Sequence, residues 1–190
     1  MKQTMVVVCT LALALCAVSA FAQAPPADTL KVDYFANANT AGAPDGTVRI
    51  TNPATNSAVG ICAAIYVFDQ YQEMSECCSC FVSHDGLRTL SVNTDLTSNP
   101  LTGVILNTGS IRIVSTKAPS TTCPFPTSLS PVAAVRAWAT HIQNSNFTVT
   151  ETASLDATFS AYEQGDLQTQ CRAIHLDGSG KGVCSCGTGD

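Results

Sequence analysis

The chain has few charged residues, and the positively charged ones are the scarcest. Only 12% of its 190 residues are Asp, Glu, Lys or Arg, about half the usual share. Nine Lys and Arg stand against fourteen Asp and Glu, which gives a formal net charge of -5. A surface of this sign repels phosphate groups, so the composition argues against nucleic acids and anionic membrane surfaces as partners. Sparse charge also gives little protection against self-association.

The sequence also lacks a catalytic signature. The tripeptide Ser83-His84-Asp85 predicts a turn, because catalytic triads are assembled from segments that are distant in sequence. Asp69, Glu73 and Glu76 have no spacing or environment that marks an acid/base pair, and they predict a solvated face. We therefore expect no enzyme activity, no catalytic residues and no cofactor.

An apolar run near the N-terminus predicts a secretory signal peptide over residues 1–22. Lys2 precedes the run at 5–20, and Ala20-Phe21-Ala22 provides the small residues that a signal peptidase needs. Two alternatives remain: an uncleaved anchor, for which no basic stop-transfer cluster follows, and a lipoprotein modified at Cys16. Bulky Leu15 occupies the position where lipoprotein processing requires a small residue.

Cleavage after Ala22 defines the mature protein. Removing 22 residues from 190 leaves 168, enough for one domain with a buried core. Residues 23–46 predict a flexible N-terminal segment with one strand, and residues 47–190 predict a disulfide-stabilised domain. The expected location is extracellular, on the cell surface or in the periplasm, with no stable membrane span after cleavage.

Eight cysteines remain in the mature chain once Cys9 and Cys16 leave with the signal peptide. An even number of cysteines in an exported chain indicates disulfides, and eight cysteines allow 105 connectivities. The disulfide candidates are Cys62, Cys77, Cys78, Cys80, Cys123, Cys171, Cys184 and Cys186.

Two cysteine clusters stand far apart in the sequence. Residues i and i+2 of an extended chain point the same way, so the clusters at 77–80 and 184–186 can each present two sulfurs to the other. Neighbouring Cys77 and Cys78 cannot bond each other without strain, so their partners lie elsewhere. The alternative is a site for Zn²⁺ or Cu⁺, or a thiol-redox site. Its ligands would be Cys77, Cys80, Cys184 and Cys186.

Alternating apolar residues and turn signals predict a mostly β protein. We expect strands at 30–35, 47–51, 59–68, 87–96, 104–106, 111–114, 132–142 and 147–150. The alanines in 132–142 also fit a helix, and the neighbouring strands favour a strand there. Ser160 and Glu163 have the spacing of a capping box, which predicts a helix over 161–174. The predicted fold is an immunoglobulin-like antiparallel β-sandwich with one C-terminal helix, stabilised by three or four disulfides.

The predicted N-terminal strand is a candidate for assembly between molecules. Its alternating residues are Leu30, Val32 and Tyr34, and residues 37–46 form a linker rich in Asn, Ala and Gly. Such a strand can pair with its own sheet or with that of a neighbour.

Three functional classes follow from the sequence. The leading one is a secreted or cell-surface, non-enzymatic structural or binding protein, including a self-assembling filament or adhesive subunit. Its partners would be copies of itself or other extracellular proteins. The alternative is an extracellular metal-binding or thiol-redox protein that uses the two cysteine clusters. An enzyme of unrecognised type is the third.

Overall fold

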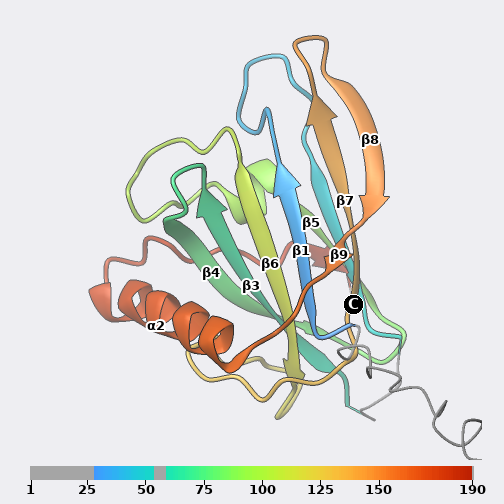
Figure 1. The fold of residues 1–190 in the computed structure, drawn as a ribbon, viewed down its shortest axis with the longest axis vertical. Helices are drawn as coiled ribbons and strands as arrows, with labels where there is room; N and C mark the ends of the chain where they lie inside the picture. The colour runs from blue at the N-terminus through green and yellow to red at the C-terminus, as the bar shows by residue number, and fades with distance from the viewer. Residues whose placement is uncertain (1–27, 54–58, 190) are drawn as a thin grey trace, which may run out of the picture.

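The computed structural model describes residues 28–53 and 59–189, so the expected signal peptide at 1–22 lies outside the described residues. Two antiparallel sheets of five strands face each other in this part of the chain (Figure 1). The order in sheet A is β4 (Met74–Val82), β3 (Ile61–Asp69), β6 (Gly109–Lys117), β1 (Leu30–Phe35) and β9 (Leu155–Asp156). The order in sheet B is β10 (Thr188–Gly189), β5 (Leu87–Ser91), β2 (Thr47–Thr51), β7 (Arg136–Gln143) and β8 (Thr148–Ala153).

β3 is buried on both of its faces, which explains its continuous apolar run. Ile61, Ile65 and neighbouring odd-numbered residues pack between the two sheets. Ala64 and Tyr66 point the other way, into a second apolar cluster under the helix α2 (Ala161–Asp177). The Tyr66 hydroxyl donates a hydrogen bond to the Pro126 carbonyl at 3.1 Å, and burial raises the pKa of Tyr66 above its ordinary value. The predicted central strand is therefore confirmed.

The capping residues fix both ends of α2. The Ser160 hydroxyl accepts a hydrogen bond from the Glu163 amide at 3.1 Å, and Gly178 ends the helix in a left-handed conformation. Leu167 and Ile174 are buried against sheet A, and Figure 1 shows the helix lying across that face. The predicted C-terminal helix is confirmed and extends three residues further, to Asp177.

The eight cysteines in the part of the chain that the structure describes form four disulfides. Their Cα atoms are 5.2 to 6.0 Å apart, within the usual range. The pairs are Cys62–Cys123, Cys77–Cys171, Cys78–Cys184 and Cys80–Cys186. The two clusters therefore meet, and the neighbours Cys77 and Cys78 have different partners, as the sequence predicts.

Alternation along β4 sends neighbouring cysteines to opposite faces of sheet A. Cys77 packs in the cluster under α2 and bonds Cys171 of that helix. Cys78 packs between the sheets and bonds Cys184 of the C-terminal segment. The dipeptide Cys77-Cys78 thus links β4 to α2 on one face of sheet A and to the C-terminal segment on the other.

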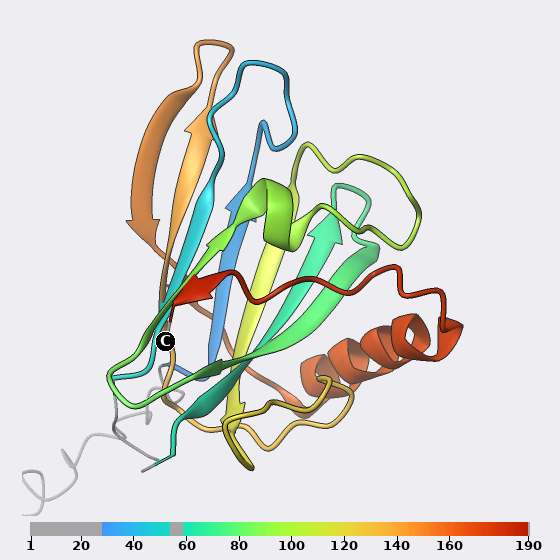
Figure 2. The ribbon, with the colours of Figure 1, turned by 180° about the vertical axis from the view of Figure 1, so that it is seen from behind.

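The C-terminal segment after α2 runs along β4 and ends in sheet B. The Cys77 amide donates to the Gly182 carbonyl at 2.8 Å, and β10 pairs with β5. Figure 2 shows this red segment crossing from the end of the helix to the opposite sheet. It covers the outer edge of β4 and helps to close the sandwich.

The strand prediction for 87–96 is only half right. β5 ends at Ser91, and residues Val92–Leu96 form a single π-helical turn, η1. The Ser91 hydroxyl accepts a hydrogen bond from the Thr94 amide, and the Ser91 amide donates to the Asp95 carboxylate. Such local side-chain bonds offer the backbone an alternative to the sheet ladder.

The N-terminal strand β1 pairs within its own chain. It lies between β6 and β9, with Leu30 buried, Val32 half-buried and Tyr34 exposed. Residues 37–46, whose composition suggests a flexible linker, are anchored to neighbouring loops: the Asn39 side chain donates to the Thr97 hydroxyl and to the Leu106 carbonyl, each at 2.9 Å. In residues 28–53 and 59–189, no helix is long and apolar enough to cross a membrane.

Candidate functional site

Two loops at one end of the sandwich form a small hollow, which we call the loop-tip surface. It encloses about 110 Å³. Its lining residues are Asp69, Gln70, Tyr71, Thr102, Val104, Ile105, Leu106, Asn107 and Thr108. These residues come from the β3–β4 turn and from the loop between η1 and β6.

Asp69 shapes the first of these loops. Its carboxylate accepts hydrogen bonds from the Tyr71 and Glu73 amides at 2.8 and 2.9 Å. Gln72 adopts a positive φ of 68° within the same turn. Both amides donate to the same oxygen, Oδ1, so Asp69 holds the turn that carries Tyr71 in position.

The second loop has fixed ends and an exposed middle. The Leu101 amide donates to the Ser75 carbonyl at 3.0 Å, and the Asn107 carbonyl accepts from the Ala38 amide at 3.0 Å. Between these anchors, Val104 and Ile105 project from the domain. The sequence predicts a strand at 104–106, and this prediction is wrong: neither sheet extends to these residues. The left-handed conformation of Gly103 (φ 71°) helps to form the loop.

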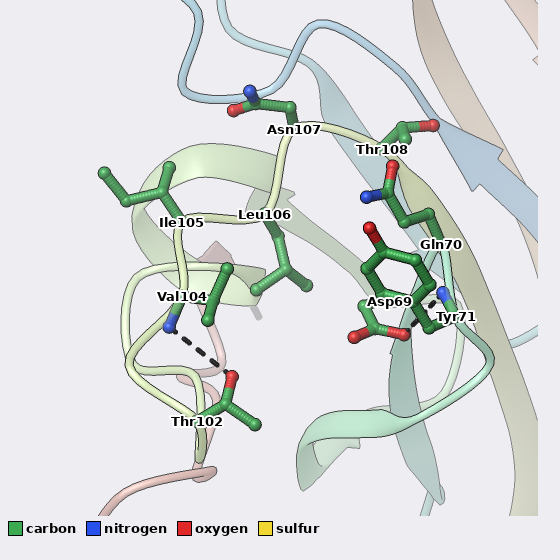
Figure 3. Close-up of a pocket in the computed structure, with 9 residues that line it drawn as sticks. All are labelled: Asp69, Gln70, Tyr71, Thr102, Val104, Ile105, Leu106, Asn107 and Thr108. Carbon is green, nitrogen blue, oxygen red and sulfur yellow. Dashed lines mark hydrogen bonds between the residues drawn. The ribbon is translucent and has the colours of Figure 1, made fainter.

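Large apolar side chains at this end are unusually exposed. Tyr71 is 74% exposed, Ile105 71% and Val104 64%. In Figure 3 the Tyr71 ring and the Leu106 side chain face the hollow, whereas Ile105 points away from it. Contiguous exposed apolar groups mark interaction sites. Five of the nine lining residues are polar, so the hollow combines hydrogen-bonding groups with exposed apolar ones.

A second cluster of chemically active side chains lies where β1 meets β7. His141 is buried, its Nε2 lies 2.8 Å from the Thr152 hydroxyl and 3.4 Å from an Asp33 oxygen, and its ring stacks on Tyr34. The Ser154 hydroxyl donates to the other Asp33 oxygen at 2.6 Å. In a catalytic triad the carboxylate and the nucleophile contact opposite ring nitrogens. Here both contact Nε2, so the cluster packs the two sheets together and forms no triad.

The other acidic and histidine candidates are not brought together. His84 and Asp85 contact each other at 3.0 Å on an exposed turn, as the sequence predicts. Glu76, expected on a solvated face with Asp69 and Glu73, is instead completely buried in β4, which corrects that prediction. The Asn99 amide donates to its Oε1 at 2.9 Å, while Oε2 has no hydrogen-bond partner among the described residues.

Burial controls the charge of Glu76. Desolvation raises its pKa to about 7, against the smaller opposing effects of the Asn99 hydrogen bond and the Lys181 charge. The carboxyl group is therefore partly protonated near neutral pH. This group belongs to the packing of the C-terminal segment and is closed to solvent.

The alternative metal ligands are all engaged in disulfides. Cys77 bonds Cys171, Cys80 bonds Cys186, and Cys184 bonds Cys78. No group of three or more His, Cys, Asp or Glu side chains in the described residues has a metal-binding arrangement. A site that uses all four of these thiolates requires reduction of three disulfides.

Comparison with known proteins identifies no relative: no family model, no curated protein and no solved structure matches this chain. The sequence reasoning missed the loop-tip surface, because Val104 and Ile105 resemble a strand. Pro100 and Gly103, which flank the apolar residues, were the signal for a protruding loop.

Proposed function

We propose that the chain is a secreted, non-enzymatic protein that binds an extracellular partner through the loop-tip surface. The exposure of Tyr71, Val104 and Ile105 on two anchored loops carries the proposal. Exposed aromatic and aliphatic side chains on a rigid scaffold gain contact area at little cost in conformational entropy. This is the arrangement of a structural or adhesive surface protein.

The proposed division of the chain begins with a signal peptide that directs export. Residues 1–22 are removed after Ala22, residues 23–46 supply the first strand, and residues 47–190 complete an immunoglobulin-like sandwich. Two antiparallel five-stranded sheets, with chain crossings between them, support that classification. Four disulfides are compatible with the extracellular space or another oxidising compartment.

A binding assay on intact cells of the source organism tests the proposal. Fluorescently labelled mature protein is compared with a Tyr71→Ser/Ile105→Ser variant. The matched control is Tyr162→Ser/Leu176→Ser, which removes two equally exposed apolar side chains from α2. We expect the loop-tip variant to lose at least about tenfold in affinity and the control to bind like the parent protein.

Two outcomes contradict the proposal. Equal binding by the parent protein and both variants would remove the loop-tip surface from the interaction. Saturable binding by none of the three proteins would refute the adhesive function itself.

A further inference from the structure

The sheet edges of the sandwich are unequally protected. The C-terminal segment covers β4 through the hydrogen bond between the Cys77 amide and the Gly182 carbonyl. β9 and β10 have two residues each. β8 has six residues, all exposed, and among the described strands it pairs with β7 alone. It is the long uncovered edge in the part of the chain that the structure describes.

The register shows which backbone groups of β8 face outward. Thr152 pairs with Ala139, and the Ser154 amide donates to the Ala137 carbonyl at 2.9 Å. Antiparallel geometry therefore directs the amides and carbonyls of Thr148, Thr150 and Thr152 toward β7. The backbone groups of the alternate residues Val149, Glu151 and Ala153 point away from the sheet.

β8 has one charged residue, Glu151, and otherwise lacks the features that usually block an edge. Its sequence, Thr-Val-Thr-Glu-Thr-Ala, contains no lysine or proline, and its ladder with β7 has no register shift. The exposed end of β1 differs, because the Tyr34 amide is capped by the Asp33 carboxylate at 2.9 Å. The outward amide of Tyr34 in β1 is therefore already bonded within the chain, whereas the outward amides of β8 are available to a partner strand.

We propose that two copies of this protein pair through β8, antiparallel and about a two-fold axis at Thr150. Residues whose backbone groups point outward must pair with each other. With the axis at Thr150, Val149 of each copy stands opposite Glu151 of the other. The two sheets B then join into one continuous sheet, held by about four main-chain hydrogen bonds at its centre.

The side chains of β8 are self-complementary in this register. Thr150 meets Thr150 of the second copy, and Thr148 meets Thr152, so every pair on one face is a threonine pair. The single charged residue, Glu151, is paired within its own chain with Arg49 and faces Val149 across the interface. Moving the axis to Glu151 would place two carboxylates opposite each other, which is unfavourable. The side chains of β8 thus favour a second copy of the same strand as partner, in the register with the axis at Thr150.

This interface is independent of the loop-tip surface, so either proposal can fail alone. The first test is the mass of the mature protein in solution, measured by size-exclusion chromatography with light scattering from about 10 μM to 1 mM. We expect a concentration-dependent dimer. Val149→Pro removes an outward amide without touching the β7 ladder, and it should abolish the dimer. Val149→Ala keeps that amide and should retain the dimer.

Cross-linking tests the register. Opposed residues in a non-hydrogen-bonded antiparallel pair have Cα atoms about 4.5 Å apart, which a disulfide spans. Thr150→Cys should therefore form a covalent dimer under mild oxidation. Thr148→Cys, whose copies would lie far apart, should cross-link at least tenfold more slowly. Peptide mapping checks that the four native disulfides are intact in both variants.

Three results overturn the proposal. They are a monomer at 1 mM, a dimer that persists in Val149→Pro, and equal cross-linking of the two cysteine variants.

Discussion

Glu76 is a buried glutamate whose ionised form is disfavoured by its surroundings. Its carboxyl group is completely buried in β4, and one oxygen has no hydrogen-bond partner in the described structure. Burial raises its pKa to about 7, whereas an exposed glutamate has a value of 4.5. Between these two pH values the folded chain binds a proton that the unfolded chain has already lost.

Stability should therefore fall as the pH rises from 4.5 through 7. The free energy of unfolding loses up to about 3 kcal/mol over this range. Glu76→Gln cannot ionise, so it should remove this dependence and be more stable than the parent protein at pH 8. Denaturant unfolding at pH 4.5, 6 and 8 measures the effect. Glu73→Gln, an exposed carboxyl nearby, is the control and should behave like the parent protein.

Two glycines should respond oppositely to substitution by alanine. A Cβ on Gly109 would collide with the Phe68 carbonyl oxygen and lie 2.7 Å from the Phe35 ring. Gly165 lies in α2 with open space around it. We expect Gly109→Ala to lower the melting temperature sharply and Gly165→Ala to stabilise by about 0.5 to 1 kcal/mol. A stable Gly109→Ala would show that β6 can move away from β3 and from the Phe35 ring at little cost.

At the scale of elements, disulfides should control separate parts of the structure. Replacing Cys77 and Cys171 by serine releases α2, whereas replacing Cys62 and Cys123 releases the loop after β6. Each change should cost about 2 to 5 kcal/mol. Hydrogen exchange should rise in α2 for the first variant and in residues 118–131 for the second. Uniform exchange changes in both variants would contradict this division.

The sequence predicted elements best where local chemistry and packing agree. The Ser160 cap and Gly178 mark the ends of α2, and the alternation in β2 matches a half-buried strand. The prediction of a strand at 104–106 failed, because the apolar residues there are exposed on a loop. The prediction for Glu76 also failed, because an isolated carboxylate gives no sign that Asn99 and the C-terminal segment will bury it.

At the scale of the whole molecule, the disulfide pattern follows from the fold more than from spacing. Sequence reasoning brought the two cysteine clusters together but could not choose among 105 connectivities. The choice depends on which face of β4 each sulfur occupies, and that depends on the register with β3. The loop-tip surface likewise depends on distant anchors, because Ala38 and Ser75 fix the two ends of its second loop.

A protein that begins at Gln23, without Cys9 and Cys16, should contain no free thiol. Titration in denaturant without reductant should detect none, and peptide mapping should link Cys62 to Cys123 and Cys77 to Cys171. It should also join residues 78–80 to 184–186. One or more thiols per molecule would favour the metal-binding or redox alternative instead.

The partners of Cys77, Cys78 and Cys80 follow 94 to 106 residues later in the sequence, and this distance imposes an order on biogenesis. Because a chain is synthesised from its N-terminus, Cys77, Cys78 and Cys80 emerge long before Cys171, Cys184 and Cys186. Until the last segment arrives, the nascent chain carries three reactive thiols on one strand. A chain that stops before Cys171 never loses them, so a thiol-reactive quality-control system can distinguish truncated products from finished protein.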